Sequence, residues 1–222
     1  VWCLRDCGSF STRRVTGIQH GQAIFSMAAS FHIEEEGYEH AAPAPKAPDP
    51  ETLPNQHDLA ERFAAMLPKP LLAYMTRPRP IEIRPTDLSR YLGAPQPEAR
   101  QAVWMRAMAA LPDDARVHRA MLAYMSDMLL LDTALVPHGL SVFQPQMQVA
   151  SLDHAIWLHR PFRADDWLLY SQDSPSANGA LGFARGMIHD RAGRLVVSFA
   201  QEGLIRRRDP ARAAKPSDAA GA

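Results

Sequence analysis

Short apolar runs alternate with turn residues over residues 1 to 40. In the third of these runs, Phe25 and Met27 fall on the same face of a strand at a period of two. Gly8 and Gly21 lie between the runs, where hairpin turns are expected. The pattern therefore predicts three short strands joined by hairpins.

The pattern changes in the next segment, which is rich in proline. Residues 41–57 show no apolar period, and a proline-rich segment extends at about 3.1 Å per residue, so it could span on the order of 50 Å. A short helix is predicted at Asp58–Leu67, stopped by Pro68 and Pro70. We therefore expect a linker with a short helix over residues 41–78.

A second unit is predicted from residue 79 onward. The apolar residues from Val117 to Leu131 recur at spacings of three and four, after a helix start at Pro112 with two following aspartates. This favours one long helix of roughly 18 residues. The strands predicted around it are Ile81–Arg84, Arg100–Met108, Gln146–Arg160, Trp167–Gln172, Ala180–His189 and Leu195–Ile205.

One helix among several hairpin-connected strands can bury its apolar side only when a curved antiparallel sheet wraps it. This predicts an α+β fold of the hotdog type. The predicted domains are strands at 1–40, the linker at 41–78, a complete hotdog at 79–207 and a disordered tail at 208–222. The first unit has strands but no helix of its own.

Composition limits the partners. The 222 residues carry 24 Lys plus Arg and 24 Asp plus Glu, so no global field favours nucleic acid or a membrane surface. The longest apolar stretch, Ala120 to Leu131, contains Asp127 and is too short to cross a bilayer. Cys3 and Cys7 are too few for a disulfide scaffold, which favours a reducing compartment. We expect neither a nucleic-acid partner nor a membrane span.

Asp127 is the most informative polar residue, because it lies on the packed face of the predicted helix, one turn from Tyr124 and Leu131. A buried carboxylate needs hydrogen-bond partners. Asp127 therefore lies on a solvated shoulder beside Ser126, bonds the sheet backbone, or faces a polar site built by other elements.

Other polar residues interrupt apolar strands. Ser151 and Asp153 share a strand face and His154 lies on the other, so the three cannot form a nucleophilic triad. Structural hydrogen bonds are the expected role of His154 and of His159, because no metal-ligand pattern surrounds them. Gln201 interrupts an apolar final strand, as either a satisfied core amide or a site residue.

Several motifs together resemble one family. They are RDCGSFSTRRV, MAASF, SDMLLLDTAL, ASLDHAIWLHRPF and QEGLIR, and they run in order from Val1 to about Arg207. They resemble the acyl-CoA thioesterase II family, the TesB-like enzymes. This resemblance implies a double hotdog that hydrolyses fatty acyl-CoA to a free fatty acid and CoA.

The resemblance also implies a site. The family's catalytic Asp, Thr or Ser, and Gln correspond to Asp127, Ser151 and Gln201. In this interpretation Asp127 accepts a hydrogen bond from the attacking water, while Ser151 and Gln201 fix the remaining hydrogen bonds. No covalent intermediate is required, because a thiolate is already a good leaving group. The resemblance implies no metal or organic cofactor.

The front of the sequence departs from the family. Further strands, the helix of the first hotdog and its Gly-Gly-Gln segment do not precede Val1, so we expect a piece of a longer chain with an incomplete first repeat. The uncovered strand face favours an exposed patch or a partner, and the resemblance suggests a homo-oligomer. Because the chain does not end in SKL, a cytoplasmic location is expected.

Two other functions stay open. One is a non-catalytic acyl-CoA-binding hotdog, or an inactive fragment. The other is hydratase or dehydratase chemistry, which would need an Asp and His pair on one hotdog helix. His118 precedes Asp127 by nine residues, a different arrangement, so this hypothesis ranks last.

Overall fold

The computed structural model describes residues 1–67, 69–89 and 96–208. Within it the chain divides into two compact units, Val1–His40 and Ala41–Ala222, called unit 1 and unit 2 below. The tail predicted over 208–222 lies outside the described residues, apart from its first residue.

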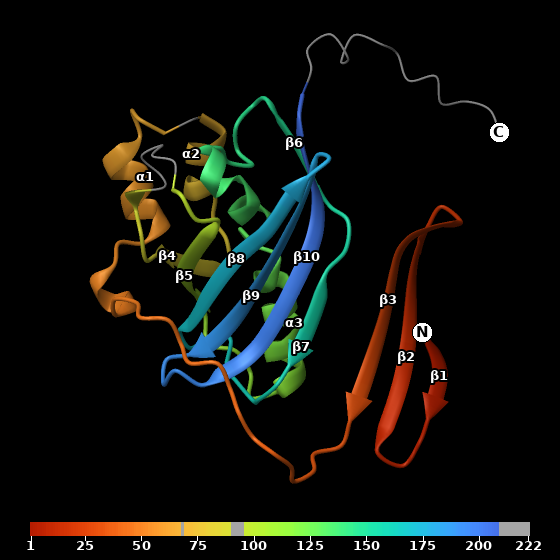
Figure 1. The fold of residues 1–222 in the computed structure, drawn as a ribbon. Helices are drawn as coiled ribbons and strands as arrows, with labels where there is room; N and C mark the ends of the chain where they lie inside the picture. The colour runs from red at the N-terminus through yellow and green to blue at the C-terminus, as the bar shows by residue number, and fades with distance from the viewer. Residues whose placement is uncertain (68, 90–95, 209–222) are drawn as a thin grey trace, which may run out of the picture. The chain divides into compact units, whose positions relative to one another are not determined.

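Unit 1 is a three-stranded antiparallel sheet in the order β1-β2-β3 (Figure 1). Its strands are β1 (Trp2–Asp6), β2 (Phe10–Gln19) and β3 (Gln22–His32), as the alternating pattern predicts. His20 and Gly21 join β2 to β3 at φ 50° and 77°, the left-handed pair typical of a two-residue hairpin. None of its residues is buried.

The segment after unit 1 differs from the prediction of a single helix. It contains the short 3-10 helix η1 (Pro50–Thr52), then α1 (Gln56–Phe63) and α2 (Lys69–Thr76). α1 begins earlier than predicted because Asn55 and Asp58 form a capping box. Pro70 does not prevent α2, because it stands in the first turn, where a missing N–H leaves no helical bond unmade.

The proline-rich segment does not span a distance as a free tether. The Trp104 indole Nε1 donates to the Pro48 carbonyl at 2.9 Å, and Arg84 Nη1 donates to that of Pro50 at 2.7 Å. His189 Nε2 lies 3.2 Å from the Ala42 carbonyl. The segment therefore packs along the outer face of the sheet.

The sheet of unit 2 is antiparallel, in the order β4-β5-β8-β9-β10-β6, with β7 also paired to β10 (Figure 1). Its strands are β4 (Ile81–Pro85), β5 (Arg100–Ala107), β6 (Met147–Ser151), β7 (Ala155–Leu158), β8 (Leu168–Asn178), β9 (Leu181–Asp190) and β10 (Leu195–Arg207). The strand predicted at Gln146–Arg160 is two strands, β6 and β7, because residues 152–154 interrupt the regular pairing with β10.

The helix against the inner face is α3 (Ala115–Ser126), capped at its start by the Asp114 carboxylate. It is shorter than predicted. The chain turns after Asp127, with Leu129 at φ 65°, and continues as the 3-10 helix η3 (Leu131–His138). The stretch Ala115–His138 is long and apolar enough to cross a membrane, but more than half of it is buried in the protein, as befits a core helix.

The core of unit 2 lies between α3 and the curved sheet. Leu122 and Met125 of α3 pack with fully buried side chains of the strands, including Met105, Tyr170 and Ile188. A sheet that curls around one helix is the predicted hotdog arrangement of an α+β fold.

Candidate active site

Asp127 stands directly after α3, at the C-cap position, where the helix ends and the chain turns toward η3. Its side chain is exposed rather than buried in the helix face. The shoulder position was therefore one correct expectation. Whether other elements also build a polar site at Asp127 is decided by the side chains that contact it.

Two side chains from the sheet reach the same oxygen of Asp127. Ser151, the last residue of β6, donates from Oγ to Asp127 Oδ1 at 3.3 Å. Gln201, on the inner face of β10 and only 1% exposed, donates from Nε2 to Oδ1 at 2.5 Å. The fold thus brings together Asp127, Ser151 and Gln201, called the polar trio below.

The trio leaves hydrogen-bonding capacity unused. Within the described residues, no hydrogen bond reaches Asp127 Oδ2, and the buried Oε1 of Gln201 has no protein partner. A carboxylate held at one oxygen by two donors can accept from a water at the other. The arrangement is therefore suited to hold and deprotonate a water molecule.

A cavity of about 300 Å³ adjoins the trio. Asp127 and Ser151 contribute to its wall, and most of the rest is apolar, including Leu131, Phe143 and Val149. A polar group at the edge of an apolar cavity suits a ligand with a reactive polar end and an apolar tail.

Known proteins share these features. The profile of the family described as Acyl-CoA thioesterase matches residues 73–204, which include the whole trio. Acyl-CoA thioesterase 2 of Haemophilus influenzae is 36% identical over 206 residues, which cover 93% of this chain and 72% of that protein. The chain belongs to the acyl-CoA thioesterase family.

Two further relatives agree with this assignment. Human acyl-coenzyme A thioesterase 8 is 36% identical over 91% of this chain, which spans 65% of that protein. The crystal structure of acyl-CoA thioesterase II TesB2 from Mycobacterium marinum is 41% identical, with a TM-score of 0.75, covering 94% of this chain and 73% of that one. Both the hotdog fold and the class of thioester hydrolase are thereby confirmed, and acyl-CoA hydrolysis is the activity that these relatives support.

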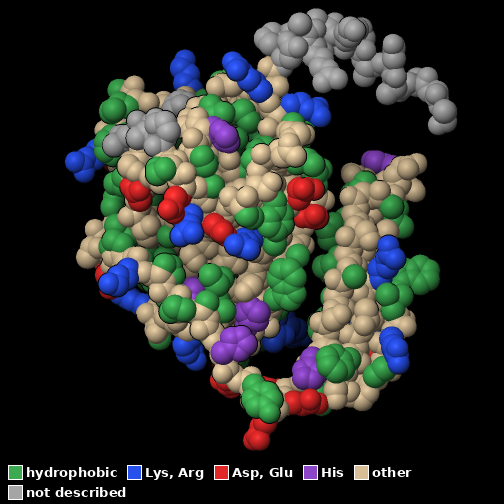
Figure 2. Space-filling view, in the orientation of Figure 1, with side chains coloured by type: hydrophobic (Ala, Val, Ile, Leu, Met, Phe, Trp, Pro, Cys, Tyr) green, Lys and Arg blue, Asp and Glu red, His purple; other side chains and the backbone are tan. Residues whose placement is uncertain are grey.

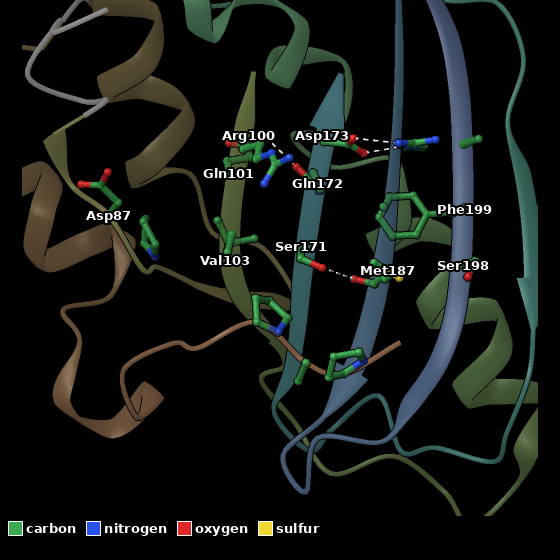
Figure 3. Close-up of a pocket in the computed structure, with 18 of the residues that line it drawn as sticks. Asp87, Arg100, Gln101, Val103, Ser171, Gln172, Asp173, Met187, Ser198 and Phe199 are labelled. Atoms are coloured by element: carbon green, nitrogen blue, oxygen red, sulfur yellow. Dashed lines mark hydrogen bonds and ion pairs between the residues drawn. The ribbon is translucent and has the colours of Figure 1, made fainter. Parts of the chain in front are cut away.

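A larger cavity of this thioesterase chain lies on the opposite face of the sheet. It measures about 930 Å³ and is lined by outward side chains such as Ser171, Met187 and Ser198 (Figure 3). These positions alternate with buried ones on the same strands, so they point away from α3 and the trio. This cavity is the larger of the two, but the polar trio adjoins the smaller one.

Charges on this outer face are balanced. Arg185 forms a two-bond ion pair with Asp173 at 3.0 and 3.1 Å, at the edge of the larger cavity. Basic and acidic side chains lie next to one another across the middle of unit 2 (Figure 2). The face therefore offers a ligand no concentrated charge.

The histidines do not join the polar trio directly. His118 Nδ1 accepts from the Ala164 backbone at 3.0 Å, so His118 serves the packing of α3 rather than a pair with Asp127. This geometry does not favour hydratase chemistry. His159 Nε2 lies 2.8 Å from Ser198 Oγ, a structural bond of the kind expected from the sequence. Among the described residues, no three His, Cys, Asp or Glu side chains gather as metal ligands.

One polar cluster beside the site was missed from the sequence. Gln101 Nε2 lies 2.6 Å from the Leu129 carbonyl, from Thr133 Oγ1 and from Gln172 Oε1. These contacts hold the carbonyl of the residue that turns the chain after Asp127. The only sequence signal was that Gln101 shares a strand face with apolar Val103 and Met105.

Proposed function

We propose that this chain hydrolyses acyl-CoA thioesters at Asp127, Ser151 and Gln201, using a water molecule as the nucleophile. The observation that carries the proposal is the convergence of the Ser151 and Gln201 donors on one oxygen of Asp127. Both donors bond Oδ1, so Oδ2 is left to accept a hydrogen bond from a water molecule. Family membership supplies the substrate class.

The trio's geometry supports a simple sequence of steps. Asp127 Oδ2 accepts a proton from the water as the water oxygen attacks the thioester carbonyl carbon. The tetrahedral intermediate then collapses, the carbon–sulfur bond breaks, and the sulfur takes the proton that Asp127 held, so that CoA leaves as the free thiol and Asp127 is ionised again. Ser151 and Gln201 keep the carboxylate in place throughout, so the reaction needs little reorganisation.

The small apolar cavity supports a place for the acyl chain. Its wall holds Leu131, Phe143 and Val149 next to the carboxylate, so an acyl tail in it leaves the thioester carbonyl at the trio. The CoA end of the substrate then lies toward solvent, on the exposed side of Asp127.

The organisation of the whole protein is part of the proposal. Residues 79–207 are a complete hotdog, and 1–40 are strands of a first repeat joined to it through 41–78. The chain spans 72% and 65% of two curated relatives.

Self-association and a cytoplasmic location belong to the same proposal. Trp157 and Leu158 of β7 are about half exposed, which supports a further chain contact at this edge. Cys3 and Cys7 are both free thiols, which fits a reducing compartment. Light scattering on the purified protein and fractionation of the source cells test these two points.

Thiol release from short, medium and long acyl-CoAs tests the activity. Asp127→Asn nearly preserves shape but removes the base, so hydrolysis should fall on the order of 100-fold or more. Asp166→Asn, at an exposed carboxylate outside the trio, is the matched control and should leave the rate unchanged. An Asp127→Asn variant at the wild-type rate would refute the site. A folded wild type that binds acyl-CoA without releasing thiol would refute hydrolysis.

A further inference from the structure

The segment between β6 and β7 contacts the immediate neighbours of two trio residues. This segment consists of Leu152, Asp153 and His154, and it follows Ser151 directly. The alternating pattern predicted a continuous strand here, so the break is a feature of the folded chain alone.

The first contact joins this segment to Glu202 of β10. The backbone N–H of Glu202 donates to Asp153 Oδ1 at 2.8 Å, and the N–H of Leu152 donates back to the Glu202 carbonyl at 3.1 Å. Glu202 is the residue after Gln201. These reciprocal bonds fix the Gln201 backbone relative to Ser151.

The second contact joins the segment to the last residue of α3. His154 Nε2 lies 2.8 Å from Ser126 Oγ, and Ser126 is the residue before Asp127. The Ser126 hydroxyl donates its one proton to the Ala123 carbonyl at 3.0 Å, so His154 Nε2–H is the donor to Ser126. His154 Nε2 therefore carries a proton, as it does in the neutral Nε2 tautomer.

The surroundings of His154 agree with this state. Burial lowers the pKa of His154, and the opposing influence of Asp127 and Asp153 is smaller. Its Nδ1 is buried and accepts no hydrogen bond from the described part of the chain. The imidazole is thus a fixed donor rather than a proton carrier.

We propose that Asp153 and His154 are positioning residues that hold the trio in register. Ser151 directly precedes the segment, Asp153 bonds the neighbour of Gln201, and His154 bonds the neighbour of Asp127. The three trio residues come from three different parts of the chain, and this segment adjoins all three. Supporting contacts of this kind matter because misplacing a catalytic group by about 1 Å can cost on the order of 100-fold in rate.

Paired variants separate the hydrogen bonds from the residues themselves. Asp153→Ala and His154→Ala each remove a contact, and kcat should fall on the order of 10-fold or more with KM little changed. Asp153→Asn keeps an acceptor oxygen, and His154→Gln places an amide nitrogen near the position of Nε2, so both should restore most of kcat. Ser126→Ala breaks the His154 bond from its other end, with minimal change in volume, and should reproduce His154→Ala.

A merely structural role predicts a different outcome in double variants. If the segment acts through Asp127, His154→Ala should lower kcat little further in a protein that already carries Asp127→Asn. If it only supports the fold, the two losses should multiply. Circular dichroism on each variant checks that the comparison is made between folded proteins.

The inference rests on the proposed function, and the two fail differently. A wild type without thiol release, or an active Asp127→Asn, overturns both. If Asp127→Asn is inactive while Asp153→Ala, His154→Ala and Ser126→Ala keep the wild-type kcat, the trio stands and the positioning role is wrong. Multiplying losses, or an Asp153→Asn or His154→Gln variant no better than its alanine counterpart, also overturns the positioning role.

Discussion

The two units contain the same kind of alternating strand but differ in what covers it. In unit 1 no residue is buried, and Phe25 of β3 remains 55% exposed. In unit 2 the strands face α3, and Met105 and Tyr170 are completely buried. The difference shows that a period of two suffices to predict strands, whereas a core needs a second layer to pack against them.

Large hydrophobic side chains make the contrast visible on the surface. Hydrophobic side chains are spread over the surface of unit 1 in Figure 2. Those of unit 1 that stay exposed include Val1, Trp2, Leu4, Phe10, Ile18, Ile24, Phe25, Met27, Phe31 and Ile33. Unit 1 therefore buries little of its apolar surface, and the buried core of the described residues lies in unit 2.

Truncating one apolar residue in each unit tests this contrast most strongly. Leu122→Ala removes a completely buried side chain of α3 and should lower the free energy of unfolding by about 2–5 kcal/mol. Phe25→Ala, at an exposed position of β3, should change it by less than about 0.5 kcal/mol. Urea denaturation followed by circular dichroism measures both. Equal losses would show that unit 1 has a core of its own.

Adding a methyl group to a glycine should lower the free energy of unfolding by less, and again only in the packed sheet of unit 2. A Cβ on Gly186 of β9 would lie 2.7 Å from the Ser171 carbonyl oxygen and would also clash with Phe199 Cζ. Gly186→Ala should therefore cost about 1–3 kcal/mol, because the strands must shift. Gly8→Ala is the matched control, since nothing lies within 4 Å of its Cβ. A tolerated Gly186→Ala would mean that the sheet of unit 2 is looser than its contacts indicate.

Regular periodicity predicted most strands of both units, and departures from it account for the errors. The helix through Leu131 was predicted too long because Leu129 has an apolar side chain but a left-handed backbone, held by Gln101. The continuous strand through residues 152–154 was wrong for a similar reason: the Leu152 and Asp153 N–H groups both donate to the Glu202 carbonyl, which breaks the register with β10, and the His154 side chain bonds Ser126. The spacing of apolar residues does not predict tertiary contacts that override the local pattern.

The candidate site follows the same division. Asp127 and Gln201 stand out in the sequence as polar residues on apolar elements, and the fold brings them together. Ser151 was indicated only by the family resemblance, because serine is common at strand ends and gives no signal of a site. Gln101 was missed, since its contacts depend on a turn that no local signal indicates.

The smallest expected effect is the pH dependence of stability. Burial lowers the pKa of His154 below the ordinary value of about 6.5, so the unfolded chain binds the proton more readily. As the pH falls below about 6.5, this group therefore lowers the free energy of unfolding until the folded form is also protonated. Above about 6.5 both forms are neutral and the contribution is fully present.

His154→Gln keeps a donor for Ser126 but cannot titrate, so the fall in the urea midpoint between about pH 7 and 5 should be shallower than in the wild type. His159, whose pKa is also lowered by burial, supplies part of the remaining slope. In unit 1 the pKa of Asp6 is lowered by its bond with Arg13, so that exposed carboxyl titrates below this window and Asp6→Asn is the control. A wild-type slope in His154→Gln, or a changed slope in Asp6→Asn, would contradict the assignment of this pH dependence to the buried imidazole of unit 2.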